Sequence, residues 1–519
     1  MNNTHILWAD DEIELLKPHI IFLTNKGYTV DKVTSGVDAI EACKTKHYDL
    51  VFLDENMPGI SGLEALAVIK SILPDVPVVM ITKSEEEHIM EDAIGSKIAD
   101  YLIKPVNSNQ ILLSIKRLLD NKRLVSEKTA QTYQQEFRQI GMDLNDVSDF
   151  SAWVNLYRKL VYWELELAAS NDTGMDEILL MQKTEANREW TKFIKKNFIN
   201  FLRKPDEHTP IMSQNVIKKK VLPELQTADA PVFLIMLDNF RFDQWKVIQS
   251  QLNEHFRLLT DDTYLTILPT TTHYARNAFF SGMMPSEIAK LYPNLWVDEE
   301  ENEGKNLHEE ELLGTQLNRL GYKDKFSYTK ITNYDNGKRL VDDIPNMFNN
   351  KFNVIVYNFV DMLSHARTEM NVMKELAEDE AAYRSITASW FEHSPLFDAL
   401  KRLAGKKAKI IITTDHGSIR VKNAVKIVGD RSTSTNLRYK QGKNLNYNDN
   451  ELFTIKDPAE AYLPKPNVSS RYVFACGTDF MAYPNNFNYH VNLYNNSFQH
   501  GGISMEEMIV PFVVLETKV

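Results

Sequence analysis

Three apolar runs in the C-terminal half of the chain each end in an aspartate, and they constrain the fold more than any other feature. The runs are VFLIMLDN (232–239), NVIVYNFVD (353–361) and KIIITTDHG (409–417). Runs of this kind are typical of strands buried on both faces of a parallel sheet. Because the carboxyl ends of parallel strands meet at one edge, we expect the polar residues after these strands to lie side by side. The pattern predicts an α/β domain over residues 226–519, with insertions at about 285–345 and 420–475.

The first 120 residues alternate short strands with amphipathic helical stretches. The strand segments are HILWADD (5–11), DKVTS (31–35), DLVFLDE (49–55), VPVVMITK (76–83) and DYLIKPV (100–106). This alternation predicts a doubly wound, five-stranded parallel sheet over residues 1–122. Residues 123–225 are charged, with apolar positions at helical spacing, and predict a helical linker domain. Its tryptophans, Trp153, Trp163 and Trp190, are interpreted as packing residues, and the domain is a candidate dimer interface.

Composition narrows the class of protein. A chain of 519 residues suggests two to four domains, and 43% hydrophobic with 25% charged residues is typical of soluble globular proteins. The only cysteines, Cys43 and Cys476, form no CxxC motif, which excludes a disulfide framework and a cysteine-rich zinc site. The net charge of −12 argues against general coating of nucleic acid. With no signal peptide and no apolar stretch near the ~20 residues of a membrane helix, we expect a cytoplasmic protein without membrane partners.

Carboxylates, a hydroxyl and a lysine follow the strands of the N-terminal region. Asp10 and Asp11 follow the first strand, Asp54 the third, Thr82 the fourth and Lys104 the fifth. Clustered carboxylates repel one another unless a cation lies among them, and oxygen ligands suit Mg²⁺. An aspartate beside bound Mg²⁺ can accept a phosphoryl group, whose oxygens a lysine and a hydroxyl can hold.

This arrangement resembles the receiver domain of two-component response regulators. The roles that the resemblance implies are phosphoacceptor for Asp54, Mg²⁺ ligands for Asp10, Asp11, Asp54 and the backbone carbonyl of Asn56, phosphate sensing for Thr82 and Lys104, and aromatic switch for Tyr101. It also implies a cognate histidine kinase as partner. Lys83 departs from the family, which usually keeps a small residue there, and its side chain is expected to crowd the pocket.

Residues of metal-ligand type also follow the strands of the C-terminal half. They are Asp238, Asp361, His365, Asp415, His416 and, near the C-terminus, His500. Each alone is equally consistent with a polar turn where the chain leaves the core. Together they suit two Zn²⁺ ions with three ligands each, and such a pair can stabilise the attacking and leaving oxygens of a phosphoryl transfer. Thr270, Thr271 and Thr272 precede a predicted helix and are candidate nucleophiles.

This half resembles the PglZ branch of the alkaline-phosphatase superfamily. The spacing from Pro269 through the threonines to Ser281 and Gly282 carries the resemblance. It implies Thr272 as the nucleophile, with Thr271 as the alternative. The implied zinc ligands are Asp361, His365 and His500 for one ion, and Asp238, Asp415 and His416 with bridging Thr272 for the other. His490 is a possible substitute ligand.

Two sequence features bear on the substrate. Arg276 lies four residues after Thr272, on the same helical face, and is predicted to bind a substrate phosphate. A basic stretch within the second insertion suits an oligonucleotide or is a solvated, mobile loop. Its basic residues and its tyrosine are Arg420, Lys422, Lys426, Arg431, Arg438, Tyr439, Lys440 and Lys443.

These features together predict a zinc-dependent phosphodiesterase acting on small or cyclic oligonucleotides through a phosphothreonine. Phosphorylation of Asp54 is expected to promote a homodimer and control the activity. The main alternative is a non-catalytic, zinc-stabilised module that docks on a sigma factor or a histidine kinase, and a phosphomonoesterase is the third possibility. The order of the three domains also resembles a family of response regulators that control type IX secretion and gliding.

Overall fold

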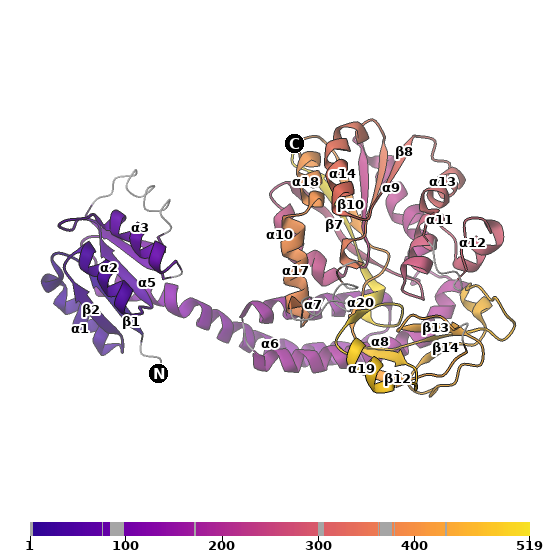
Figure 1. Ribbon diagram of the computed structural model, residues 1–519, viewed down its shortest axis with the longest axis horizontal. Coiled ribbons are helices and arrows are strands. Elements are labelled where there is room, and N and C mark those ends of the chain that lie inside the picture. The colour runs from indigo at the N-terminus through magenta and orange to yellow at the C-terminus, as the bar shows by residue number, and fades with distance from the viewer. Residues whose placement is uncertain are drawn as a thin grey trace. The chain divides into compact units, whose positions relative to one another are not determined.

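The computed structural model describes residues 4–519 except 75, 84–97, 171–172, 299–305, 362, 364–375, 378 and 431–432, with the backbone path alone for 120–128, 170, 173 and 174. The chain forms two compact units (Figure 1). The first comprises Met1–Gln134 and Ala169–Asp172, and the second comprises Gln135–Ala168 and Thr173–Val519. None of the helices within the described part of the chain is long and apolar enough to cross a bilayer.

The first unit contains the predicted five-stranded parallel sheet, in the order β2-β1-β3-β4-β5. Its strands are β1 (His5–Ala9), β2 (Thr29–Val33), β3 (Leu50–Asp54), β4 (Val78–Thr82) and β5 (Asp100–Ile103). Its helices are η1 (Ile13–Leu16), α1 (Lys17–Asn25), α2 (Gly36–Thr45), α3 (Gly62–Ile72), α5 (Ser108–Ile115) and η2 (Lys116–Asp120).

Alternation along the strands sends side chains to both faces of this sheet. In β1, Leu7 packs with residues of α2 and α3 on one face, whereas Trp8 packs with residues of α1 and α5 on the other. The three central strands, β1, β3 and β4, are buried on both faces and almost wholly apolar, and polar side chains follow or end them at their carboxyl ends.

Three long helices follow the first sheet: α6 (Asn121–Asp146), α7 (Phe150–Ser170) and α8 (Thr173–Arg203). The boundary between the two units falls within α6. Trp153 of α7 packs edge-on against Trp190 of α8, with ring centroids 5.3 Å apart. Asn187 of α8 donates a 2.9 Å hydrogen bond to Glu506, so α8 is fastened to the C-terminal α/β region.

The second unit is built on a six-stranded sheet in the order β7-β18-β10-β6-β9-β8 (Figure 1). The strands are β6 (Val232–Leu237), β7 (Phe256–Leu265), β8 (Phe326–Ile331), β9 (Phe352–Tyr357), β10 (Lys409–Thr413) and β18 (Ile509–Thr517). The four strands β10, β6, β9 and β8 are parallel, and β18 is antiparallel to both of its neighbours. The three apolar runs of the sequence therefore occupy adjacent positions, β10-β6-β9, and their carboxyl ends share one edge.

The remaining elements surround this sheet. Those before β10 are η3 (Ser213–Asn215), η4 (Ile217–Val221), α9 (Leu222–Thr227), α10 (Phe242–Leu252), η5 (Thr272–Arg276), α11 (Asn277–Ser281), α12 (Pro285–Leu291), α13 (Glu309–Arg319), α14 (Tyr334–Met347), α17 (Glu380–Glu392) and α18 (Pro395–Ala404). Those after β10 are β11 (Ile419–Arg420), β12 (Asn423–Lys426), β13 (Tyr439–Gly442), β14 (Phe453–Ile455), η6 (Pro458–Ala461), β15 (Arg471–Phe474), β16 (Asp479–Ala482), α19 (Phe487–Tyr494), β17 (Phe498–Gln499) and α20 (Met505–Met508).

The predicted insertion at 285–345 is wrong in part. It contains β8, which pairs with β9 at the edge of the main sheet, and the helices on either side of that strand. The segment was mistaken for an insertion because an edge strand is only half-buried and lacks a continuous apolar run. The strands of residues 420–475 do lie outside the main sheet: β13, β15 and β14 form a sheet of their own, whereas β11 pairs with β17 and β12 with β16.

Candidate functional site

The carboxyl ends of the first sheet bring together three of the predicted receiver residues. Nζ of Lys104 lies 2.8 Å from Oδ2 of Asp10 and 3.0 Å from Oδ1 of Asp54. Asp10 and Asp54 are buried, and Asp11 is exposed beside them. Oxygens of Asp10, Asp11 and Asp54 lie within 4.8 Å of one another, which is an arrangement that fits a cation with oxygen ligands.

The charge balance of this cluster favours a further cation. Burial raises the pKa of Asp54 to about 6, and the negative charge of Asp10 adds to the rise, although the bond from Lys104 opposes it. Burial and the charge of Asp10 both disfavour the ionised form of Asp54, and a bound cation would offset both effects. The donor set and this charge therefore fit Mg²⁺.

The other predicted receiver residues lie around the same edge. The Thr82 hydroxyl donates to the carboxylate of Glu55, and Tyr101 reaches the Thr82 side chain. Asn56 is exposed immediately after Glu55. Lys83 donates at 3.0 Å to Glu12 in an exposed pair, so its side chain turns to the surface and does not crowd the carboxylates.

A second cluster forms where β6 and β10 end. Asp238 follows β6, and Asp415 and His416 follow β10; all three are buried and offer ligand atoms within 4.8 Å of one another. Oγ1 of Thr272, the first residue of η5, donates to Oδ1 of Asp238 at 3.3 Å. The same oxygen lies 3.2 Å from Nε2 of His416. The Thr272 hydroxyl thus lies directly against the cluster.

Thr271, the alternative nucleophile, is placed differently. Its side chain is buried, and its Oγ1 forms no hydrogen bond within the described part of the chain. It is the N-cap residue of η5, and its side chain is not hydrogen-bonded to any of the described candidate ligands. The geometry therefore favours Thr272 as the residue that can react at this edge.

His416 and His500 both place Nδ1 near a backbone carbonyl oxygen and Nε2 on the side of the candidate ligands. Nδ1 of His416 lies 3.1 Å from the carbonyl oxygen of Gly417, and Nδ1 of His500 lies 3.2 Å from that of Thr270. A carbonyl oxygen can only accept, so Nδ1 carries the proton in both rings and a neutral ring keeps a lone pair on Nε2. This is the tautomer that a zinc-binding histidine adopts, held by a backbone partner.

The second predicted set of ligands is described only in part. Nε2 of His500 lies 3.7 Å from Oδ1 of Asp361, and the His500 ring stacks on that of His416 with centroids 4.3 Å apart. The two sets therefore adjoin. His365 lies outside the described residues. His490 lies on α19, where its ring stacks on Tyr494, and it contacts none of the described candidate ligands.

Arg276 does not lie where the sequence predicted. It is fully buried, and its guanidinium binds Asp238 at 2.5 Å, Asp415 at 3.0 Å and Glu309 at 3.3 Å. Because three protein carboxylates engage its guanidinium, the prediction that Arg276 binds substrate gives way to a role in holding the two aspartates. The helical spacing from Thr272 is as expected, but that helical face points into the protein.

The pKa values of the two buried aspartates in this cluster are shifted in opposite directions. Burial raises the pKa of Asp238 well above its usual value, with the charges of Asp415 and Asp361 adding to the rise. Burial also acts on Asp415, but Arg276 and His416 outweigh it and lower the pKa of that carboxyl to about 2. Carboxylates and imidazole in a buried, electron-rich cluster fit Zn²⁺.

Sequence reasoning missed Glu309 and Glu507, which support this site, and it missed the supporting role of Thr270, which it named only as a candidate nucleophile. Glu309 is buried and binds Arg276 and Lys330, whereas its place in a run of glutamates is a pattern more typical of an exposed helix face. Thr270 accepts from the amide of Gly501 and holds His500 through its carbonyl. Glu507 accepts from the amide of Gly502 at 2.9 Å and binds the buried Arg438 at 2.5 Å. No local sequence signal marks these contacts, because their partners are distant in the chain.

The basic stretch after β10 is not one mobile surface. Arg438 is buried against Glu507, and Lys440 is buried with its Nζ 2.8 Å from the carbonyl oxygen of Ser434. Tyr439 is buried as well, and Arg431 lies outside the described residues. These side chains hold β13 in place and are not available to an oligonucleotide.

Comparison with known proteins finds three family models in order along the chain. The response regulator receiver domain matches residues 6–116, the PorX response regulator linker domain matches 123–202, and the BREX system PglZ alkaline phosphatase-like domain matches 216–515. The last model covers more than half of the chain.

Curated relatives include the transcriptional regulatory proteins ZraR of Klebsiella oxytoca and ResD of Bacillus subtilis. ZraR is 31% identical over 136 residues, which are 26% of this chain and 31% of ZraR. ResD is 30% identical over 131 residues, which are 25% of this chain and 54% of ResD. The chain therefore spans about a third to a half of the length of these relatives. Among solved structures, the response regulator TrrA of Thermotoga maritima in complex with Mg(2+)-BeF is 31% identical, with 22% of this chain and 99% of that chain covered and a TM-score of 0.21.

Proposed function

The chain belongs to the PglZ family of alkaline phosphatase-like domains, joined to a receiver in the order of a PorX-like response regulator, and from this we propose that it is a zinc-dependent phosphodiesterase controlled by phosphorylation. The observation that carries the proposal is the position of Thr272. Its hydroxyl lies 3.3 Å from Asp238 and 3.2 Å from His416, at the edge where two strands deliver metal-ligand side chains.

Two sets of residues at this edge would each hold one zinc ion. Asp238, Asp415 and His416 would bind one ion, with Thr272 beside it, and the proposed ligands of the second are Asp361, His365 and His500. Bound zinc would lower the pKa of a hydroxyl or water and offset charge on phosphoryl oxygens. The Nδ1 contacts of the two histidines, which leave Nε2 as the atom for a metal, and the buried aspartates support this assignment.

The chain's own residues would act in two steps. In the first, Oγ1 of Thr272 forms a bond to phosphorus and loses its proton to water, while the bond from phosphorus to the leaving oxygen breaks and that oxygen gains a proton from water. In the second, a water oxygen replaces Oγ1, and Thr272 regains its proton. Asp238 and His416 position the hydroxyl in both steps, and Arg276 keeps Asp238 and Asp415 in place.

The buried position of Arg276 favours diesters over monoesters. A phosphate monoester carries an additional negative charge, which a phosphomonoesterase would offset with a further cation. Arg276 is engaged by Asp238, Asp415 and Glu309, and the nearby Lys330 is engaged by Glu309. Neither cation is available to a second phosphoryl charge. We therefore propose small or cyclic oligonucleotides as substrates, which are diesters.

Control would come from the receiver. A cognate histidine kinase would phosphorylate Asp54, and the phosphorylated receiver would promote a homodimer that changes the activity of the second unit. We assign these roles to domains at 1–122, 123–225 and 226–519, in a cytoplasmic regulator of type IX secretion and gliding. A sigma factor remains a candidate partner.

The first experiment combines metal content by mass spectrometry with hydrolysis of bis-p-nitrophenyl phosphate and p-nitrophenyl phosphate. We expect about two zinc ions per chain and preferential cleavage of the diester. Thr272→Val should lose at least 100-fold in kcat, because the nucleophile is absent, while keeping its zinc. Thr271→Val is the matched control and should retain activity, because its buried hydroxyl has no described partner.

Each other outcome has a definite meaning. Equal losses in the two variants would show that both act through packing of η5 and would remove the evidence for Thr272. Faster cleavage of the monoester would make the protein a phosphomonoesterase. Bound zinc without cleavage of either ester would favour the docking module.

A further inference from the structure

The loop that carries His500 packs closely against the insertion at 420–475. His500 follows β17 and stands before Gly501 and Gly502, in the segment that leads to α20. Gly501 has φ +123°, a backbone conformation that favours glycine. A Cβ atom on Gly502 would lie 2.5 Å from the carbonyl oxygen of Ala475 and 2.8 Å from a guanidinium nitrogen of Arg438. The two glycines therefore let the loop approach the insertion.

Thr270 holds the same loop from the segment that contains the candidate nucleophile. Its hydroxyl accepts from the amide of Gly501 at 2.9 Å and donates to the carbonyl oxygen of Gly502 at 3.0 Å. Its own carbonyl oxygen lies 3.2 Å from Nδ1 of His500. Thr270 is fully buried and stands two positions before Thr272. A single residue thus holds both the loop and the ring of His500.

Glu507 of α20 joins this loop to the one that follows β10. Its Oε1 accepts from the amide of Gly502 at 2.9 Å. Its backbone carbonyl accepts from the amide of Gly417 at 3.1 Å, directly after His416. Glu507 is fully buried. The loops of two candidate zinc ligands therefore meet at one residue, which holds His500 through its side chain and His416 through its backbone.

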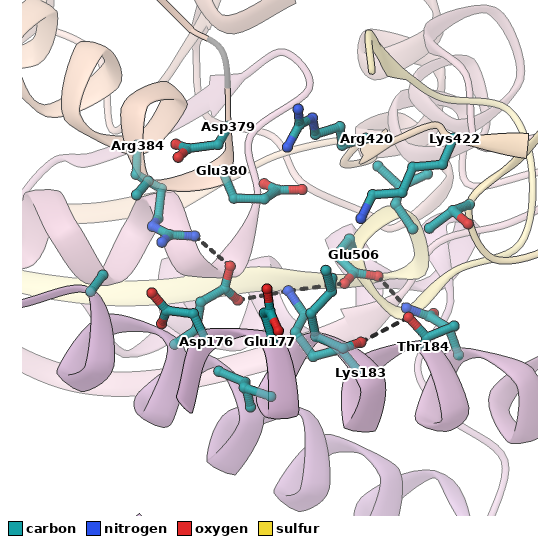
Figure 2. Close-up of a pocket in the computed structure, with 18 residues that line it drawn as sticks. Asp176, Glu177, Lys183, Thr184, Asp379, Glu380, Arg384, Arg420, Lys422 and Glu506 are labelled. Carbon is teal, nitrogen blue, oxygen red and sulfur yellow. Dashed lines mark hydrogen bonds and ion pairs between the residues drawn. The ribbon is translucent and has the colours of Figure 1, made fainter. Parts of the chain in front are cut away.

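The helix that carries Glu507 is itself fastened to α8. Glu506 accepts from Asn187 at 2.9 Å and lies 3.4 Å from Nζ of Lys183 (Figure 2). The amide of Met505 donates to Asn187 at 2.8 Å. Lys183, Asn187 and Glu506 border a cavity of about 300 Å³ between α8 and the C-terminal α/β region. Glu507 therefore extends from an element that is anchored to the linker helices.

The charge of Glu507 is balanced by Arg438, which belongs to the insertion. Nε of Arg438 donates to Oε1 of Glu507 at 3.2 Å, and Nη2 donates to Oε2 at 2.5 Å. Both side chains are fully buried. A buried carboxylate needs a paired cation, and a bidentate guanidinium also fixes the plane of the carboxylate. Arg438 therefore orients the oxygen that accepts from the amide of Gly502.

We propose that Arg438, Glu507 and Thr270 are positioning residues for the zinc centre, because together they hold the His500 loop in the geometry that binds one of the two ions. This inference rests on the proposed function, since it takes His500 as a zinc ligand. It extends that function by making the insertion at 420–475 a structural part of the centre. Partners that orient a metal ligand typically change metal affinity by about 10–100-fold when they are removed.

The test measures the zinc affinities of the full chain by competition with a chromophoric chelator, together with Tm in the metal-free state. Thr270→Val removes the hydroxyl and keeps the shape, so it should weaken one zinc ion by about tenfold or more and leave the other unchanged. Thr270→Ser keeps the hydroxyl and should restore the affinity. Arg438→Lys keeps the charge beside Glu507 but loses the bidentate contact, and should behave like Thr270→Val.

Two substitutions are the matched controls. Thr271→Val removes a buried hydroxyl that has no hydrogen-bond partner in the described part of the chain. Arg471→Lys changes an exposed arginine of β15, in the sheet that also contains β13. Both variants should keep the wild-type zinc affinities.

His500→Ala separates positioning from general packing. It should lose the same zinc ion that Thr270→Val and Arg438→Lys weaken. In the His500→Ala background these two substitutions should cause no further loss, because the loop that they hold no longer carries a ligand.

The proposal is overturned if Thr270→Val and Arg438→Lys bind both ions as tightly as wild type, whatever their Tm. It is also overturned if they weaken zinc binding equally in the His500→Ala background. Both results leave the proposed function standing, since they concern neither Thr272 nor ester cleavage. Two bound ions without cleavage of either ester would refute the proposed function alone, and a wild-type chain without zinc would refute both. If Arg438→Lys does not fold, the Thr270 variants decide.

Discussion

At the edge that carries the candidate zinc ligands, single residues matter through the charge they hold in a buried place. Arg276 contributes the only side-chain cation within 4 Å of Asp238 and Asp415 among the described arginines and lysines. Without a metal ion, removing this cation would leave two buried carboxylates and Glu309 with much less compensation, and breaking such pairs costs about 3–5 kcal/mol. The arginine therefore stabilises the site in the absence of metal.

Arg276→Met tests this at the residue scale. In chelator, we expect the variant to lose about 3–5 kcal/mol of unfolding free energy, measured by urea denaturation. With saturating zinc the loss should be smaller, because the ion supplies part of the missing positive charge. Arg402→Met removes an exposed arginine of α18 and should change stability by no more than ~0.5 kcal/mol. A loss in the Arg276 variant that is independent of zinc would contradict this account.

Between elements, the site depends on how closely the loop after β10 approaches α20. A Cβ atom on Gly417 would lie 2.1 Å from the carbonyl oxygen of Glu506. Because that oxygen belongs to the backbone, it cannot move aside as the end of a flexible side chain could. Gly417 follows His416 directly, so any shift of the loop also moves a candidate zinc ligand.

Gly417→Ala should therefore lower the free energy of unfolding by ~1–3 kcal/mol, measured by thermal unfolding. It should also reduce the zinc content, measured by mass spectrometry. Gly405→Ala is the control, since it has φ −75° and its nearest atom would be 3.5 Å away. It should be neutral or slightly stabilising. Equal behaviour of the two variants would mean that the close approach to α20 is not required.

The whole molecule divides into a unit with the receiver and a unit with the proposed catalytic site. A signal from Asp54 must therefore pass between units, and a change in association is the simplest way. The exposed Lys83 pairs with Glu12 and should have little part in this signal.

With Mg²⁺, the phosphoryl mimic beryllofluoride should about double the mass of the wild-type chain in light scattering and change its diester turnover. Asp54→Asn should show neither response, because the acceptor carboxylate is gone. Lys83→Ala should respond like wild type. If the wild-type chain keeps both its mass and its turnover, the proposed control by dimerisation is refuted.

The fold and part of the site followed from local sequence patterns. The strands were predictable because burial on both faces requires long apolar runs, as in VFLIMLDN and KIIITTDHG, and the comparisons confirm the receiver, linker and PglZ order. Since parallel strands end at one edge, the sequence also indicated that Asp238, Asp415 and His416 would meet. These inferences need only the chain's own periodicity.

Tertiary structure alone decided which charges are paired and which are free to act. Arg276 was predicted to bind a substrate phosphate, and Arg438 to lie in a basic stretch that binds an oligonucleotide or is a mobile loop. Both are buried against carboxylates that lie far away in the chain. The strand β8 joins the main sheet although its own sequence is only half-apolar. Arg420 and Lys422 line a cavity together with residues of α8, which precede them by more than 200 positions in the chain. The energy of a charge depends on every neighbour in space, and a sequence pattern reports only the neighbours along the chain.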